Sequence, residues 1–439
     1  MKPTHLNRFF LVLAMALLLP AASCGGRSEQ DERETPPRGR PGVNLHPIAE
    51  EFLQGNLLPR SFIGTSEHIQ DAIQRQIAER GVVLYDMAML VKALLLYPAD
   101  NASMIAGLVT ALRDGTDVRS NLDFTYDTPI TLSEGYFYKI IEVDATWLPQ
   151  QTQPITGENA WLASALASVH AAYPGSATAA DAFRMLTQLT RAIVALQTPS
   201  GLVRMAPSEP RNYAYLGIDY HATASIENNL SCIPVLKYMS TRAPSGERAT
   251  YAAALAKLEN AVLEMYNVNG RYFNTGKDLA TGEVNTKFAT DCQTWCILAF
   301  GPERLDALML ERYGVPNASA RLLERTLEIA GVQKEGAYAG LDFYDRASVI
   351  SFEWSLGFLS AAREVLALNE NAALRQAVTT INAYIASRVT TPGLLPYTDS
   401  PEPVDTGHGW ITIPLMNSLA SSAWYIFETA EATVNPFDI

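Results

Sequence analysis

The chain has 439 residues, 48% of them hydrophobic and 18% charged, and its formal net charge is −13 at pH 7. This acidic balance argues against nucleic acid or an anionic membrane surface as a partner, and it suits neutral sugars better than polyanions. The length is large for a single core, but no second polar linker follows residue 42, so we predict one large domain.

The N-terminus has the pattern of an export signal. Basic residues precede an apolar run over residues 9–19, and small residues then lead up to Cys24. This order predicts a signal peptide over residues 1–23, because the run is too short to span a bilayer comfortably. The small residues before Cys24 resemble the bacterial lipobox, although Ala21 stands where that motif usually has Leu. The resemblance implies an exported lipoprotein whose diacylated Cys24 anchors it to the cell envelope, at the outer membrane. An ordinary cleaved signal peptide is the alternative.

A polar segment follows the signal. Residues 25–42 are Gly, Ser, Glu, Arg and Pro with almost nothing apolar. Such a composition cannot bury enough surface to offset the cost of ordering. We therefore predict a flexible tether over residues 24–45 and a folded domain over residues 46–439.

The three remaining cysteines each lie in an apolar helical pattern: Cys232, Cys292 and Cys296. We interpret them as small buried hydrophobes rather than as a disulfide or metal ligands. The sequence has no Cys/His cluster with zinc spacing, no glycine-rich phosphate loop and no serine nucleophile elbow. It therefore predicts no metal and no cofactor.

An internal repeat decides the predicted fold. Six segments share a polar head, then a large apolar residue, then an almost wholly apolar stretch, and their heads are Asp86, Glu158, Glu227, Asp291, Glu353 and His408. The intervals between heads are 72, 69, 64, 62 and 55 residues, which suits one helical hairpin with its loops.

Two kinds of helix alternate along this repeat. Helices that are apolar all round are predicted at residues 87–96, 161–169, 230–239, 295–300, 356–362 and 411–427, and such helices are buried. Amphipathic helices are predicted at residues 68–80, 103–113, 178–197, 247–266, 318–330 and 372–387. The alternation predicts an all-α fold, an (α/α)6 toroid of six inner and six outer helices. A tetratricopeptide array is the rival, but its units are shorter, about 34 residues.

The polar heads are predicted to lie in the first turns of the inner helices. Ser225, Thr290 and Ser351 are suitable N-cap residues, and Thr290 with Gln293 has the spacing of a capping box. All six starts would meet on one rim of the toroid. For any single acid, attraction to the helix N-terminus is a sufficient explanation.

The set as a whole indicates a sugar-binding rim, because amides bond to hydroxyls and indoles stack on pyranose rings. Asn229 and Trp410 accompany the heads, and His221 follows Asp219 and Tyr220 just before the third inner helix. The predicted substrate contacts are Asp86, Glu158, Asn159, Trp161, His221, Asn228, Gln293, Trp295, Trp354 and His408.

Four of these segments resemble the inner-helix motifs of bacterial exported six-hairpin glycosidase-like proteins: residues 156–162, 225–230, 291–301 and 351–357. The resemblance covers about residues 80–430, and its motifs are short. Asn228 stands where such motifs often have His. The resemblance implies the six-hairpin toroid and a carbohydrate substrate; it does not identify the glycan.

Glycoside hydrolysis needs two carboxyl groups across the scissile bond, one protonated and one ionised. We predict Asp291 as the acid and Glu227 as the base, with Glu353, Asp86 and Glu158 as reserves. Two alternatives remain at this point. One is a polysaccharide lyase or sugar epimerase on the same fold; the other is a non-catalytic glycan-binding lipoprotein of the envelope.

Overall fold

The computed structural model describes residues 45–114, 136–137, 140–144, 154–208, 219–391, 393–430 and 434–439. The predicted signal peptide, Cys24 and almost all of the predicted tether lie outside these ranges. The chain from Pro41 to Ile439 forms one compact unit. None of the described helices is long and apolar enough to cross a membrane.

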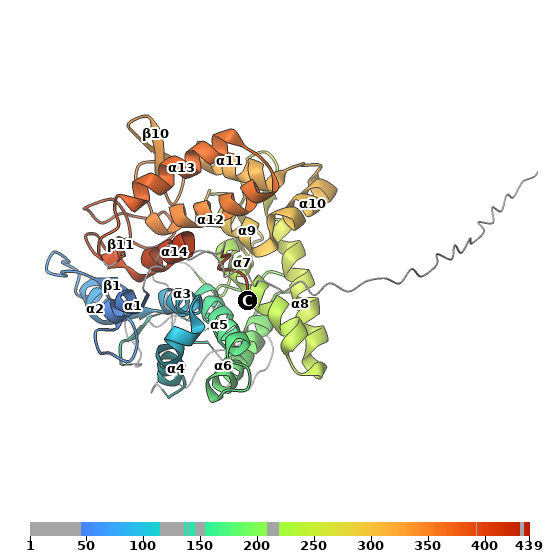
Figure 1. Ribbon diagram of the computed structural model, residues 1–439. Coiled ribbons are helices and arrows are strands. Elements are labelled where there is room, and N and C mark those ends of the chain that lie inside the picture. Colours follow the sequence, from blue (N-terminus) through green and yellow to red (C-terminus); the bar gives the residue numbers. More distant parts are fainter. Residues whose placement is uncertain are drawn as a thin grey trace, which may run out of the picture. The chain divides into compact units, whose positions relative to one another are not determined.

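Six helices form a closed inner ring. Each contacts the next one along the chain, and the last contacts the first (Figure 1). They are α3 (Leu84–Leu94), α5 (Thr156–Ala172), α7 (Ile226–Arg242), α9 (Thr290–Phe300), α12 (Phe352–Leu368) and α14 (Leu419–Thr429). Most of their residues are buried, as expected for helices without a polar face.

A second set of helices packs outside this ring: α4 (Pro98–Asp114), α6 (Ala177–Ala195), α8 (Ser245–Leu263), α10 (Pro302–Tyr313), α11 (Ala318–Ala330) and α13 (Ala372–Ala386). The (α/α)6 toroid is therefore confirmed. The sequence did not predict α10, which packs beside α9 and α11. Two further helices, α1 (Leu45–Leu53) and α2 (Ala72–Arg80), precede the ring. The helix predicted over residues 68–80 corresponds to α2, which packs mainly on short strands rather than on an inner helix.

Short antiparallel strands lie between the helices. They pair as β2 (Gly81–Val83) with β3 (Ile140–Glu142), β5 (Tyr266–Asn267) with β6 (Tyr272–Phe273), and β9 (Gly331–Lys334) with β10 (Ala337–Leu341). Two three-stranded sheets have the orders β4 (Thr223–Ser225), β7 (Gly276–Asp278), β8 (Val284–Asn285) and β1 (Phe62–Ile63), β12 (Asn417–Ser418), β11 (Leu395–Pro396). Strands β2, β4 and β12 run directly into α3, α7 and α14, so the sheets fix where these inner helices begin.

A repeated hydrogen bond ties the inner helices to these connections. In five of the six, the side chain four residues after the N-cap residue makes two kinds of hydrogen bond. It donates to the carbonyl of the N-cap residue, and it also bonds to the backbone of a neighbouring connection. The five side chains are Asn159, Asn229, Gln293, Ser355 and Ser422. Each satisfies backbone groups that would otherwise be buried without a partner.

Two details of the predicted helix starts are wrong. Ser225 and Ser351 do cap α7 and α12, but Thr290 is the first residue of α9 and its hydroxyl donates to the Asp342 carbonyl at 2.6 Å. Gln293 does not complete a capping box, because its amide is committed to the backbone of Phe273.

The sixth inner helix begins later than predicted. We expected a helix over residues 411–427 headed by His408, whereas α14 begins at Leu419. Gly407 and Gly409, on either side of His408, have φ values of 72° and 98°, and Leu415, inside the expected helix, has a φ of 59°, none of which a helix allows. Pro414 has no amide hydrogen for a helical bond. His408 therefore lies in a loop before β12 rather than at a helix N-terminus.

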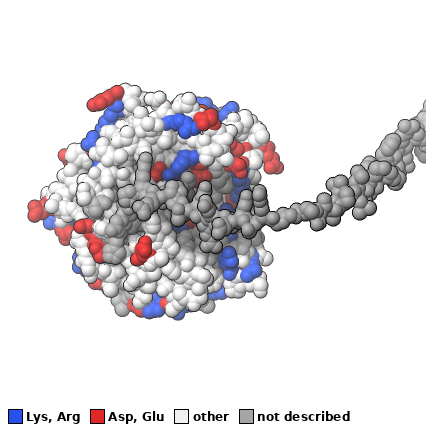
Figure 2. Space-filling model, viewed as in Figure 1, with Lys and Arg blue, Asp and Glu red and all other residues white. Residues whose placement is uncertain are grey.

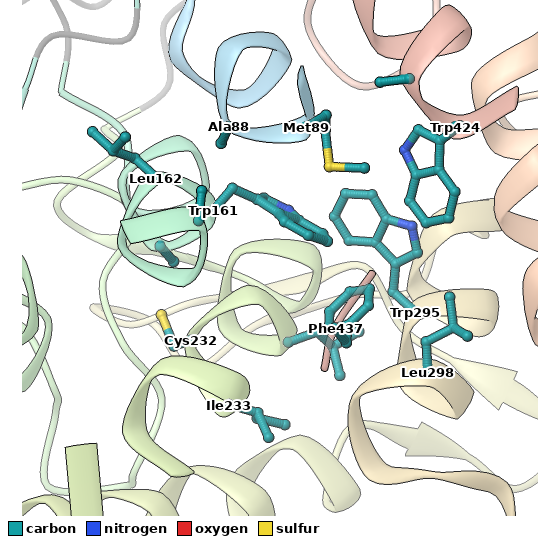
Figure 3. Close-up of a cluster of buried hydrophobic side chains, with 14 of the residues drawn as sticks. Ala88, Met89, Trp161, Leu162, Cys232, Ile233, Trp295, Leu298, Trp424 and Phe437 are labelled. Carbon is teal, nitrogen blue, oxygen red and sulfur yellow. The ribbon is translucent and has the colours of Figure 1, made fainter. Parts of the chain in front are cut away.

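The centre of the ring is filled by aromatic side chains. Trp161, Trp295 and Trp424 occupy equivalent positions, six residues after the N-cap residues of their helices, and Trp161 and Trp295 meet edge to face with centroids 5.2 Å apart. Phe437, from the C-terminal segment, packs against both, at 4.7 Å and 5.6 Å (Figure 3). The C-terminal segment therefore reaches the aromatic centre of the ring through Phe437.

The C-terminal segment is held at the ends of the inner helices opposite their starts. The Asn435 amide donates to the Leu298 carbonyl near the end of α9, at 3.0 Å. The buried ammonium of Lys92, near the end of α3, donates to the Asp438 carbonyl at 3.0 Å. One end of the toroid is thus closed by the chain itself, so a site is expected at the other end, where the inner helices begin.

Candidate functional site

The second and third residues after each N-cap form the rim of the toroid. In chain order the second positions are Tyr85, Gly157, Glu227, Asp291, Glu353 and Ala420, and the third positions are Asp86, Glu158, Asn228, Cys292, Trp354 and Ser421. The five acidic heads therefore do lie in the first turns of inner helices. Figure 2 shows that charges of both signs are dispersed over the visible outer surface, so the grouping of acids at the rim is a local feature.

Glu353 is one of the buried carboxyl groups of the rim, with 5% of its surface exposed, the same fraction as Asp291. The Trp424 indole N–H donates to the Tyr85 hydroxyl oxygen at 2.7 Å, and the Tyr85 hydroxyl is in turn hydrogen-bonded to Glu353. Burial above all, together with the charges of Asp86 and Asp291, raises the pKa of Glu353 to about 8, while the Tyr85 bond acts in the opposite direction. Glu353 is thus mainly protonated at neutral pH.

Asp291 lies on the adjacent inner helix and is also buried. The backbone N–H of Cys292 donates to its carboxylate at 2.7 Å, which favours the ionised form. Burial outweighs this bond and raises the pKa of Asp291 to about 7. Two carboxyl groups that influence each other and titrate near neutral pH are the pattern expected for acid and base catalysis.

Glu227 and Asn228 link the starts of α5 and α7. The Asn228 amide nitrogen donates to Glu227 Oε2, and its carbonyl oxygen accepts from the Gly157 backbone N–H, both at 2.6 Å. A Cβ atom at Gly157 would come within 2.9 Å of the Asn228 amide, so this approach requires glycine. The negative charges of Glu227 and Asp291 both act on the buried Cys292 thiol, whose pKa is raised chiefly by burial. Glu227 and Asp291 therefore act on the same thiol. Glu158, which follows Gly157 in the chain, is half-buried.

Aromatic side chains form a wall beside Glu353. Trp354 packs against Phe343, His408 and Trp410, with centroid distances of 5.0, 5.5 and 6.3 Å. His408 Nε2 lies 3.3 Å from the Phe343 carbonyl oxygen, so this nitrogen carries the proton and Nδ1 is left as an acceptor. Burial lowers the pKa of His408, which keeps the ring neutral at neutral pH.

Several predicted substrate contacts have other partners. The Asn159 and Gln293 side chains are fully buried and committed to the backbone bonds described above. Trp161 and Trp295, at 2% and 4% exposure, pack in the aromatic centre, and Trp354, also at 4%, packs in the aromatic group beside Glu353. All three have almost no surface for a ligand. For the first four residues the correction has one physical reason: in this ring, helix positions four and six residues after the N-cap residue face the packed interior.

His221 lies in the connection before β4. Its ring Nδ1 is 3.1 Å from the Ala206 carbonyl oxygen, and its backbone N–H bonds to Asp219. The buried cysteines, in contrast, are as predicted: Cys232, Cys292 and Cys296 are free thiols within apolar helix faces.

Three residues of the site were missed from the sequence. Tyr85 immediately precedes Asp86, and aligning the helix starts would have placed it level with Glu227, Asp291 and Glu353. Trp424 and Tyr397 gave no such signal, since their roles depend on contacts across the ring. The charges of Glu353, Asp86 and Asp291 all act on the Tyr397 hydroxyl, whose pKa is raised first by burial.

Solved structures with the same fold include three that act on sugars by name. They are a sugar epimerase from a ruminal bacterium (TM-score 0.57, 12% identity, covering 89% of this chain and 97% of that one), the cellobiose 2-epimerase of Bacillus thermoamylovorans (0.55, 10%, 88% and 99%) and the GH76 α-mannanase of Bacteroides thetaiotaomicron (0.54, 10%, 88% and 94%). No protein-family model and no curated protein sequence matches the chain significantly. At these identities the likeness defines the fold: the chain has the (α/α)6 toroid of six-hairpin glycosidases and sugar epimerases.

Proposed function

We propose that the protein is a carbohydrate-active enzyme and, within that class, a glycoside hydrolase acting on a neutral poly- or oligosaccharide. The observation that carries this proposal is the pair Glu353 and Asp291, two buried carboxyl groups with pKa values of about 8 and about 7 on adjacent inner helices. Glycoside hydrolysis requires one protonated and one ionised carboxyl group, and this pair offers both near neutral pH.

The surroundings of the two carboxyl groups assign the roles. The Cys292 N–H donates to the Asp291 carboxylate and favours its ionised form, so Asp291 acts as the base or nucleophile. Glu353 is buried and has the negative charges of Asp86 and Asp291 acting on it, which favours its protonated form, so it is the general acid that protonates the leaving oxygen. The sequence-based pair, Asp291 as acid with Glu227 as base, is replaced in this proposal, and Glu227 and Asp86 become reserve bases.

The electrostatic surroundings support a neutral substrate. Within the described residues, the charged groups that act on Glu353 are the carboxylates Asp86 and Asp291. A uronate placed among them would be repelled, whereas hydroxyl groups can donate to carboxylates at no such cost. The neutral His408 adds an acceptor nitrogen on the same side as Trp354.

Activity would be sought on a panel of neutral glycans, with reducing ends, epimers and unsaturated products measured together. Glu353→Gln and Asp291→Asn keep the side-chain shape and remove the titration, so each should lower kcat roughly 10²–10⁴-fold. Glu311→Gln, an exposed position on α10, is the matched control and should keep full activity. Near wild-type turnover in both folded site variants would refute the assignment.

The products also separate the alternatives. A sugar epimerase would convert its substrate without releasing reducing ends, and the neutral imidazole of His408 with a free Nδ1 is the observation that favours it. A lyase would produce unsaturated sugars. Glycan binding without any product would indicate a binding protein.

We further propose that the enzyme is exported and attached to the bacterial cell envelope, at the outer membrane, through a lipid on Cys24. The support is the N-terminal pattern of an apolar run and small residues before that cysteine. Cys24→Ser should abolish incorporation of radiolabelled palmitate and release the protein into the soluble fraction. Unchanged membrane partitioning of this variant would contradict the anchor.

A further inference from the structure

Trp410 differs from the other tryptophans of the described chain. The other four are exposed by 4% or less and belong to the core or its edge, whereas 37% of the Trp410 surface is exposed. An exposed indole leaves a large apolar surface hydrated, so a ligand that covers it gains free energy.

The indole is held in a fixed orientation. Its side chain is hydrogen-bonded to the Tyr397 hydroxyl, and its ring meets Phe343 and Trp354 at interplanar angles of 79° and 67°. The Trp410 carbonyl accepts from the Thr406 backbone N–H at 3.1 Å and from the Thr406 hydroxyl at 2.9 Å. No ring in the described part of the chain stacks parallel on the indole.

The loop that carries Trp410 is itself constrained. Gly407 has a φ of 72°, and a Cβ atom there would lie 2.9 Å from the Tyr344 ring. The Arg346 guanidinium donates to the Asp405 carbonyl at 3.1 Å and pairs with the buried Asp342. Trp410 is therefore presented by a rigid loop, and a ligand does not have to order it.

Two neighbours of Trp410 place it near the acids of the rim. Its partner Tyr397 is the residue on which the charges of Glu353, Asp86 and Asp291 all act. Trp354, which packs against Trp410, directly follows Glu353 on α12. The exposed indole thus borders the carboxyl group to which we assign the acid role.

We propose that Trp410 is the stacking platform for a second sugar ring, next to the ring that is held at Glu353 and Asp291. The substrate class that follows is an oligo- or polysaccharide of at least two pyranose units, bound by a neutral ring with an apolar face on Trp410. This inference rests on the proposed function, because it takes the ring at the acids to be a sugar.

Two neighbouring apolar side chains suggest a different occupant. Ile411 and Leu415 are exposed by 51% and 62%, so the loop could instead rest on a lipid surface. The arrangement favours the glycan, since the Trp410 nitrogen is engaged by Tyr397 at the acid-rich rim and the net charge of the chain is negative. Lipid binding is kept as an outcome of the test.

The test measures binding and turnover in the full-length protein in detergent. The probes are neutral gluco- and manno-tetrasaccharides of both anomeric linkages, together with the matching monosaccharides. Trp410→Ala should weaken tetrasaccharide binding about tenfold and leave monosaccharide binding unchanged, because one stacking contact is lost. Trp410→Phe should recover part of the loss, and Ile411→Ala, the matched control, should bind as the wild type does. On an active tetrasaccharide the loss should appear in KM rather than in kcat.

Each other result has a defined meaning. Equal binding of both probe lengths by Trp410→Ala and the wild type would overturn the platform, as would an equal loss for both lengths. An added quencher lowers the fluorescence of Trp410 as long as the indole is accessible. If vesicles of phosphatidylethanolamine and phosphatidylglycerol relieve this quenching and tetrasaccharide does not, the loop binds lipid, and the platform is also overturned. Tetrasaccharide binding that depends on Trp410 without any product would leave the platform standing and refute the hydrolase. Binding of no probe would overturn both.

Discussion

The raised pKa of Glu353 has a consequence for stability that can be measured without a substrate. In the folded protein this carboxyl group has a pKa of about 8, against an ordinary value of 4.5. Between these two values the folded state binds a proton that the unfolded state has lost. Stability is therefore greatest below about pH 4.5 for this group, and it falls as the pH rises towards 8.

The magnitude follows from the size of the shift. One pH unit within this window changes the free energy of unfolding by roughly 1.4 kcal/mol, so about 2.5 units from the ordinary pKa to pH 7 amount to roughly 3 kcal/mol. Glu353 has 5% of its surface exposed, so solvent screening reduces this figure little. Glu353→Gln is neutral at every pH and removes the effect while retaining a hydrogen-bonding partner for Tyr85.

Urea unfolding of the wild type and of Glu353→Gln at pH 5 and pH 7 would test this. The variant should gain about 2–3 kcal/mol relative to the wild type between the two pH values. Glu311→Gln, exposed on α10, should show no such relative gain. If the wild type and Glu353→Gln lose stability in parallel, the carboxyl group is ionised in the folded state and its role as the acid is wrong.

Three further predictions concern the surroundings of the site. Phe437→Ala should lower the free energy of unfolding by about 3–5 kcal/mol, because it leaves a cavity beside Trp161 and Trp295; urea midpoints measure this, and an unchanged midpoint would show that the C-terminal segment does not close the ring. Tyr85→Phe removes the bond that lowers the pKa of Glu353, so the alkaline limb of the kcat/KM profile should move to higher pH; a downward shift would contradict a hydrogen bond of Tyr85 to the acid. Gly157→Ala should reduce kcat/KM by displacing Asn228, a change that Gly246→Ala, with open space around its Cβ, should not produce.

Stabilising residues and candidate site residues lie side by side in the first turns of the inner helices. Five inner helices use the side chain four residues after the N-cap residue to secure their backbone, and five present an acid two or three residues after it. Successive side chains on a helix differ in direction by about 100°, so neighbouring positions in the same turn face different surroundings. One position can therefore bond to the backbone in the interior of the ring while another presents an acid at the rim.

The fold and the general location of the site could be predicted from the sequence because both depend on local pattern. All-apolar stretches that alternate with amphipathic ones indicate inner and outer helices wherever they occur. The position of a carboxylate in the first turn of a helix can be predicted from the helix start alone. Asp86, Glu158, Glu227, Asp291 and Glu353 were placed on this basis. His408 was misplaced because apolar pattern alone does not show that glycine and proline delay the start of α14.

Only the tertiary structure decided which of these acids act together. Ring closure brings α14 against α3, so that Trp424 reaches Tyr85 and Tyr85 reaches Glu353. These three residues come from three helices, and Tyr85 and Trp424 are 339 positions apart in the chain. The same closure turns Asn159, Gln293, Trp161 and Trp295 inward and places Phe437 against the two indoles. A pKa depends on burial and on charges from other helices, and neither is encoded in the spacing of residues along the chain.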